Sequence, residues 1–129
     1  MPPKESQYPR DWLKLAEKDW RRMGRALADG DAEEVGFWLE QAVEKYLKAY
    51  LLSKGWALRK VHDLEVLLNE TAVHMPTFGR YGPACQRISG YYLTERYPFV
   101  NPQILTLEEV SGSRDDVTEL VKLIRQELE

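Results

Sequence analysis

The side chains that could form a binding site gather at one junction between two predicted helices. Lys45 and Lys48 lie on a helix that ends before Gly55, and His62 and Asp63 follow at the start of the next helix. Lysine binds phosphate as a point charge, and the N-terminus of a helix attracts anions. Asp63 at that same helix end would oppose an anion, so the junction is compatible with a binding site and with an ordinary helix cap.

Each part of this junction has a structural interpretation as well as a functional one. Glu44 and Lys48 are spaced i, i+4, which favours a surface ion pair worth roughly 0.2–0.5 kcal/mol. His62 can donate to a neighbour while Asp63 caps the helix. In the functional interpretation, His62 and Asp63 face Lys48, Arg59 or Arg96 in a polar pocket, where an Asp–Arg or Asp–Lys pair would fix the junction.

A second group of candidate residues closes the fourth predicted helix. Arg96 and Tyr97 come directly before Pro98, which disfavours the α conformation in the residue that precedes it. An arginine at this position is stabilised by the negative end of the helix dipole, and it can also bind a phosphate through two hydrogen bonds. The candidates for binding nucleotide or RNA are therefore Lys45, Lys48, His62, Asp63, Arg96 and Tyr97.

Several classes of chemistry lack the residues that they need. The chain of 129 residues has one cysteine and two isolated histidines, so no internal disulfide forms and no zinc spacing is present. Cys85 is expected to be a small core residue rather than a nucleophile. We find no phosphate loop and no paired catalytic carboxylates, and we expect no catalytic residue, metal or cofactor.

Charge and hydropathy indicate a cytoplasmic protein without a membrane segment. The formal net charge is −3, which gives no overall attraction to nucleic acid. The apolar runs are too short to cross a bilayer, and the N-terminal stretch MPPKESQYPRDW has no apolar signal-peptide core.

The first predicted helix is rich in cations. Its five basic residues are Lys14, Lys18, Arg21, Arg22 and Arg25. Glu17 and Asp19 interrupt the run along the sequence, which weakens a duplex-binding interpretation. We therefore interpret these residues as a solvated helix face.

Apolar residues recur with helical periodicity throughout the chain, and no stretch alternates convincingly as a strand does. Short connections between amphipathic helices favour antiparallel neighbours. We predict an all-α fold, an up-and-down antiparallel four-helix bundle with an additional short fifth helix, in a single domain over residues 1–129 whose core covers about 9–128. The predicted helices cover about 9–29, 32–54, 63–75 and 83–97, with a short turn at 106–109 and a last helix that begins at a capping box at Ser113 and ends near Leu128.

The aromatic content favours a protein interface. The chain has four tryptophans and seven tyrosines, and aromatic residues are enriched at interface cores. Of Tyr91 and Tyr92, we expect one in the core and one at the seam of a homodimer, although either could stack on a base.

Three stretches together resemble the HEPN family, named for higher eukaryotes and prokaryotes nucleotide-binding. The first runs from Trp12 to Trp20 and holds an aromatic residue followed by alanine and acids. The second is EQAVEKYLKA over residues 40–49, followed by Gly55 and His62-Asp63-Leu64. The third is Gly90-Tyr91-Tyr92 with Arg96-Tyr97-Pro98.

The resemblance implies a bacterial or archaeal domain, often a dimer and often encoded beside a minimal nucleotidyltransferase. Many members are metal-independent ribonucleases that use an arginine followed, after four to six residues, by a histidine late in the chain. Neither histidine here has that spacing, and none follows Arg96. The resemblance thus implies a non-catalytic dimeric partner of a nucleotidyltransferase, in a two-component or toxin–antitoxin-type system, that binds nucleotide or RNA. The alternative is a divergent ribonuclease or RNA-binding toxin.

Overall fold

The described part of the chain consists of helices and their connections. The computed structural model describes residues 6–91 and 105–129. Its elements are α1 (Pro9–Asp29), α2 (Ala32–Ser53), α3 (Leu64–His74), the 3-10 helix η1 (Pro76–Tyr81), α4 (Gly82–Ser89) and α6 (Leu107–Leu128). These two ranges contain no strand, so the predicted all-α fold is confirmed. None of their helices is long and apolar enough to cross a membrane.

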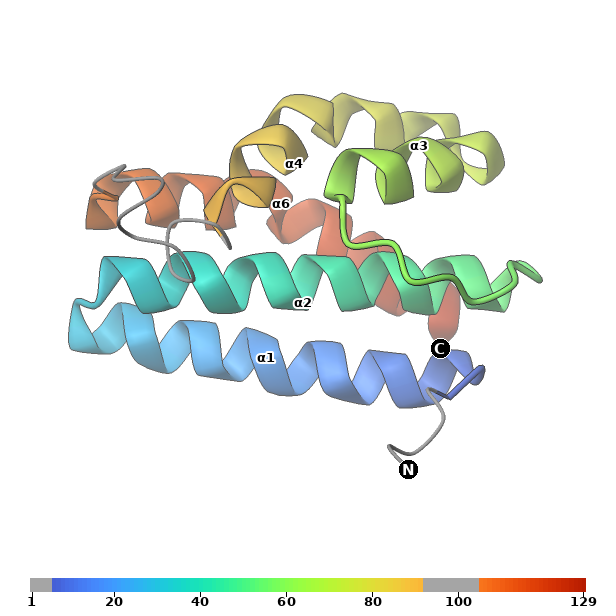
Figure 1. The fold of residues 1–129 in the computed structure, drawn as a ribbon, viewed down its shortest axis with the longest axis horizontal. Coiled ribbons are helices and arrows are strands. Elements are labelled where there is room, and N and C mark those ends of the chain that lie inside the picture. Colours follow the sequence, from blue (N-terminus) through green and yellow to red (C-terminus); the bar gives the residue numbers. More distant parts are fainter. Residues whose placement is uncertain (1–5, 92–104) are drawn as a thin grey trace.

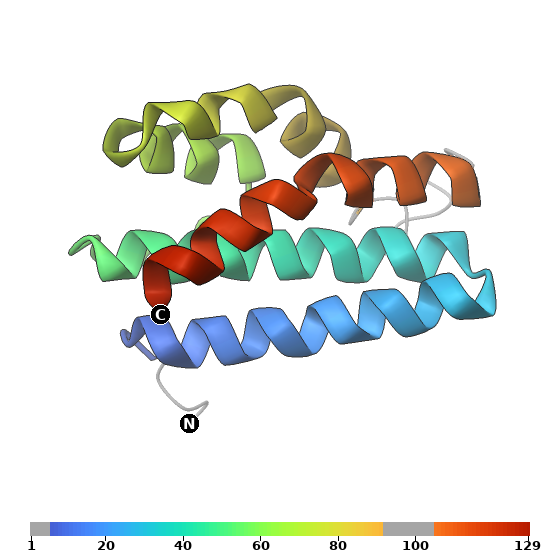
Figure 2. The ribbon, with the colours of Figure 1, turned by 180° about the vertical axis from the view of Figure 1, so that it is seen from behind.

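The helices form a bundle around α2. Figure 1 shows α2 between α1 on one side and α3 with α4 on the other, while α6 crosses α2 obliquely. Figure 2 shows the crossing of α6 from the opposite side. Helix α1 packs mainly against α2 and also contacts α6, and it contacts no other described helix. The arrangement confirms the predicted antiparallel bundle with an additional short helix.

Local signals set the connection between α1 and α2. Pro9 occupies the first turn of α1, and Gly30 ends the helix with a φ of 73° in the left-handed region that glycine tolerates best. Asp31 then caps α2 by accepting a hydrogen bond from the backbone N–H of Glu34 at 3.2 Å. The two helices are therefore joined by a tight reversal and run side by side.

The broad apolar face of α2 forms the centre of the core. Its side chains at Val35, Leu39, Leu47 and Tyr50 are buried, with 0–1% of their surface exposed. The Tyr50 ring meets Phe78 of η1 edge to face, with centroids 5.1 Å apart. Helices α1, α3, α4 and α6 all contact α2, which explains why so much of its circumference is covered.

A polar cluster ties α6 to α1 and α2. Arg125 donates from Nε and Nη2 to the two carboxylate oxygens of Glu17, both at 2.7 Å. The Tyr46 hydroxyl donates to Glu17 at 2.7 Å and accepts from Arg125 at 3.0 Å. Burial alone would raise the pKa of Glu17, but the hydrogen bonds from Arg125 and Tyr46 outweigh it and lower that pKa.

The last helix begins earlier than the sequence predicts. Thr106 caps α6 by accepting from the backbone N–H of Glu109 at 3.1 Å, and the helix continues through Ser113 to Leu128. The predicted start at Ser113 is therefore wrong. The Ser113 side chain is buried and lies 2.8 Å from the Tyr91 hydroxyl, so this partner, rather than a helix end, satisfies it.

Tyr91, two residues after the end of α4, approaches α2 at a glycine. Tyr91 is buried, with 5% of its surface exposed, as one of the two adjacent tyrosines was predicted to be. A Cβ added to Gly36 would lie 3.2 Å from Tyr91 Cβ and 3.1 Å from Leu105 Cδ1. A residue without a side chain therefore lets this part of the chain pack closely on α2. Tyr92 lies outside the described residues.

Candidate functional site

Two of the predicted binding residues meet at one buried carboxylate. Lys48 Nζ donates to Glu44 Oε2 at 3.1 Å. His62 Nδ1 lies 3.2 and 3.1 Å from the two carboxylate oxygens of the same Glu44. The Lys48 ammonium also lies 5.2 Å from the centroid of the Trp12 ring. We call Glu44, Lys48 and His62 the Glu44 cluster.

The Glu44–Lys48 pair is not the surface pair that its spacing predicts. The side chains of Lys48 and Glu44 are only 2% and 7% exposed. Because neighbouring elements surround α2, an i, i+4 pair on this helix is buried instead of solvated. A buried pair of this kind is costly to break, since removing one partner leaves an uncompensated charge in the interior.

Glu40 lies one turn before Glu44 on α2, and it was not among the predicted binding residues. Its side chain is buried and accepts a hydrogen bond from Gln41 Nε2 at 2.9 Å. Burial and the nearby Glu44 carboxylate raise the pKa of Glu40 to about 8. The available signal was the repeat of charged residues at 40, 44 and 48 on a helix that is otherwise largely apolar.

Lys45 faces α1 and does not join the Glu44 cluster. Its ammonium is bonded to Asp19. Asp19 is itself 2% exposed and also accepts from Arg22 Nη1 at 2.9 Å. Lys45 and Lys48 thus each have a carboxylate partner inside the molecule, so neither ammonium presents an isolated charge to a phosphate.

Asp63 acts as the N-cap of α3, as its position predicts. Its Oδ1 accepts from the backbone N–H groups of Glu65 at 2.8 Å and Val66 at 3.4 Å. Arg59, a suggested partner of Asp63, is bonded to Glu70 instead. Arg96 and Tyr97 lie outside the described residues.

In the Glu44 cluster, the Glu44 carboxylate fixes the orientation of the His62 imidazole. The His62 side chain is 74% exposed, while its Nδ1 lies against a carboxylate that is almost fully buried. When Nδ1 carries the proton, Nε2 is left as the acceptor at the solvent-exposed edge of the ring. Such an arrangement suits proton transfer better than it suits anion binding, because the negative Glu44 lies directly behind the imidazole.

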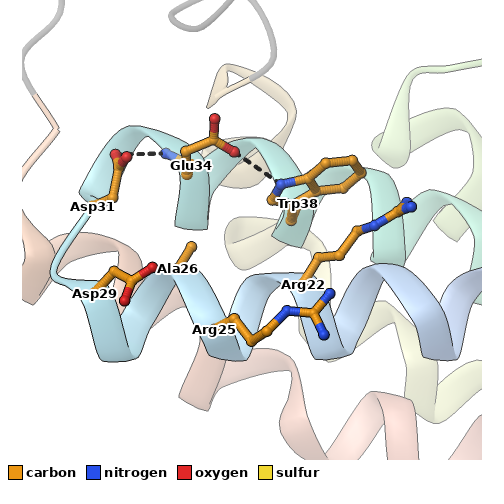
Figure 3. Close-up of a pocket in the computed structure, with 7 residues that line it drawn as sticks. All are labelled: Arg22, Arg25, Ala26, Asp29, Asp31, Glu34 and Trp38. Atoms are coloured by element: carbon orange, nitrogen blue, oxygen red, sulfur yellow. Dashed lines mark hydrogen bonds between the residues drawn. The ribbon is translucent and has the colours of Figure 1, made fainter.

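A separate pocket lies at the opposite half of α2, near its N-terminus. Figure 3 shows how its lining residues project from α1 and α2. Its volume is about 270 Å³, and its lining consists of Arg22, Arg25, Ala26, Asp29, Asp31, Glu34 and Trp38. The Trp38 indole N–H donates to Glu34 Oε2 at 2.9 Å, and the Arg22 guanidinium lies 4.6 Å from the centroid of the Trp38 ring. The lining mixes two arginines with three carboxylates, so it does not form an anion site.

Metal and thiol chemistry find no support in the described residues. Across 6–91 and 105–129, no group of three or more histidine, cysteine or acidic side chains is arranged to hold a metal ion. Cys85 is buried, and this burial raises the pKa of its thiol to about 12. A thiol with such a pKa stays protonated at neutral pH and is a poor nucleophile.

A family model and a solved structure both match most of this chain. The family model described as "HEPN domain" matches residues 9–128. The crystal structure of TT1696 from Thermus thermophilus is similar, with a TM-score of 0.78 and 26% sequence identity. That match covers 92% of this chain and 96% of TT1696. A search of curated proteins gave no match.

Proposed function

The chain belongs to the HEPN domain family, and we propose that it acts as a non-catalytic, dimeric partner of a minimal nucleotidyltransferase. The pair would form a two-component or toxin–antitoxin-type system in which the helical domain contributes to binding nucleotide or RNA. One feature carries the non-catalytic part of the proposal: no histidine in the chain follows an arginine at the spacing that HEPN ribonucleases use. Without that pair, the late part of the chain lacks the usual proton-transfer group for attack by a ribose hydroxyl.

The positions of the two histidines support the non-catalytic role. His62 lies against Glu44 at the connection that follows α2. The His74 ring, at the end of α3, packs against Tyr50 with centroids 6.4 Å apart. Neither histidine stands in the late part of the chain, where the family's nuclease motif belongs.

An exposed apolar surface on α3 supports association with another protein. Val66 and Val73 are 42% and 79% exposed. They are seven residues apart, so they lie on the same side of the helix. We propose that the homodimer contact lies on this side of α3, because two exposed apolar side chains share it.

The proposal is tested by the oligomeric state and by co-purification. We expect light scattering to give a dimer for the wild type and a monomer for the double variant Val66→Lys and Val73→Lys. The matched control is Leu15→Lys with Leu107→Lys, which places two charges on exposed apolar residues of other helices. A wild-type monomer, or a control that dissociates equally, would contradict this interface. A nucleotidyltransferase encoded next to the gene should co-purify with the wild-type chain.

A divergent ribonuclease is the second candidate, and the Glu44 cluster favours it. An exposed imidazole held through Nδ1 by a buried carboxylate is suited to act as a general base. Lys48, with 2% exposure, is too deeply buried to touch the phosphate of a substrate. The test is RNA cleavage by nuclease-free preparations of the wild type and of His62→Ala. Cleavage by the wild type that His62→Ala abolishes would establish the second candidate and overturn the first.

A further inference from the structure

Four exposed cations form a straight line along α1. Lys14, Lys18, Arg21 and Arg25 are all exposed, and we call them the basic stripe. Their spacings of four, three and four residues place them within about 60° around the helix axis, at 3.6 residues per turn. The buried residues of α1 include Trp12, Ala16 and Met23 and face the opposite direction.

The two acids that interrupt this run in the sequence are each paired with a cation outside the stripe. Asp19 points into the bundle and is bound by Lys45 and Arg22. Glu17 points toward α6 and forms the two-point contact with Arg125. Asp19 is therefore paired inside the bundle, and Glu17 is paired with Arg125 while it still attracts Arg21 of the stripe. The fold therefore reduces the interruption that the two acids make in the sequence.

Within the described residues no close ion pair holds the stripe, although Glu17 attracts Arg21 and Arg25 lines the pocket that contains Asp29, Asp31 and Glu34. In residues 6–91 and 105–129, none of the four cations forms an ion pair within 4 Å. Helix α1 contacts only α2 and α6 among the described helices, and Figures 1 and 2 show it at the edge of the bundle. Asp11 and Asp29 are the nearest acids on α1 beyond the ends of the stripe. A local positive field thus persists on a protein whose net charge is −3.

We propose that the basic stripe binds the phosphate backbone of an RNA strand lying along α1. This inference rests on the RNA-binding part of the proposed function and gives it a surface. The stripe runs over twelve residues, whose eleven steps of 1.5 Å cover about 16.5 Å, and its regularly repeated charges match a linear polyanion. Lysine and arginine contacts to phosphate fix position without reading bases, so binding is independent of sequence.

The inference is tested by fluorescence anisotropy with a labelled twelve-nucleotide oligo(U) RNA. Four phosphate contacts on a single strand predict that log K falls with log salt with a slope of about −3. The affinity of the wild type should therefore drop about 50-fold between 50 and 200 mM KCl. The stripe variant, with all four cations changed to glutamine, should bind at least tenfold more weakly at 50 mM with a slope near zero.

A matched control separates the stripe from overall charge. Its four glutamine substitutions replace the exposed cations Lys54, Lys60, Arg80 and Lys122, and they lower the net charge by the same amount. This control should keep the affinity and the salt slope of the wild type. The inference is overturned if the control loses as much affinity as the stripe variant, or if wild-type binding is absent at 50 mM. Circular dichroism should show that both variants fold.

Two further measurements separate this inference from the proposed partner role. A twelve-residue polyglutamate peptide that binds as tightly as oligo(U) would mark the stripe as a site for acidic proteins and overturn the RNA assignment. The stripe variant should still co-purify with the nucleotidyltransferase. If it co-purifies while the wild type binds no RNA, the inference fails and the partner role stands. If the variant loses the nucleotidyltransferase, the stripe is that partner's docking surface and the inference fails.

Discussion

Replacing Glu40 with glutamine isolates the cost of one buried carboxyl group on α2. Glu40 is 3% exposed, and burial next to Glu44 raises its pKa from 4.5 to about 8. Between these two pH values the folded protein keeps the proton while the unfolded chain releases it. The contribution of neutral Glu40 to the free energy of unfolding is therefore fully present below pH 4.5, and it is lost as the pH rises through about 8.

The size of this effect follows from the two pKa values. One pKa unit corresponds to about 1.4 kcal/mol, so the rise to about 8 removes about 5 kcal/mol by pH 9 and about 3 kcal/mol by pH 7. Glutamine stays neutral in both states, and its amide oxygen can still accept from Gln41 Nε2. Glu40→Gln should therefore be more stable than the wild type by about these amounts, with little difference at pH 4.

Urea unfolding of both proteins at pH 4, 7 and 9 measures the difference directly. Titrations shared by the two proteins cancel in the comparison. The control is Glu33→Gln, which removes an exposed carboxylate from the same helix and should change stability by less than about 1 kcal/mol at every pH. A difference between Glu40→Gln and the wild type that stays constant with pH, or a destabilised variant at pH 9, would refute the reasoning.

Three other predictions concern the core. Glu44→Gln leaves the buried Lys48 ammonium without its carboxylate, so the free energy of unfolding in urea should fall by about 3–5 kcal/mol. Gly36→Val crowds Tyr91, where even a Cβ would lie at 3.2 Å, and should cost about 1–3 kcal/mol, measured as a lower thermal midpoint. The Cys85 thiol, with its pKa raised to about 12 by burial, should resist a disulfide reagent at pH 8 until urea unfolds the protein.

Each of these predictions has its own control. Glu119→Gln removes the carboxylate from an exposed pair with Lys122 and should cost less than about 1 kcal/mol. An equal loss in Glu119→Gln and Glu44→Gln would show that burial does not set the cost. Gly24→Val has open space around its Cβ, so a loss as large as that of Gly36→Val would argue against crowding. Rapid labelling of Cys85 in the native protein would contradict its burial.

Helix boundaries were predictable where a local signal sets them. Gly30, Asp31 and Gly55 act through their own backbone conformation or a hydrogen bond a few residues away, and both glycines have positive φ. The start of α6 was only half predictable, because Thr106 and Ser113 each begin a capping-box pattern. The choice between them depends on Tyr91, which supplies a distant partner for Ser113.

The candidate site was less predictable, because its chemistry depends on what covers α2. The spacing of Glu44 and Lys48 is the same for a surface pair and a buried pair, and only the packing of neighbouring helices separates the two. The direction of Asp19 on α1 likewise depends on Lys45 of α2. His62 was found as a candidate from its place at the junction, but its partner Glu44 could only be identified once the connection after α2 was placed.

Co-expression of this chain with a minimal nucleotidyltransferase, its proposed partner, tests the central claim most directly. The two proteins should elute together in size-exclusion chromatography, and light scattering should give a mass that contains two copies of this chain. The same complex should leave RNA uncleaved. Elution of this chain alone as a monomer, while the nucleotidyltransferase elutes separately, would contradict the account.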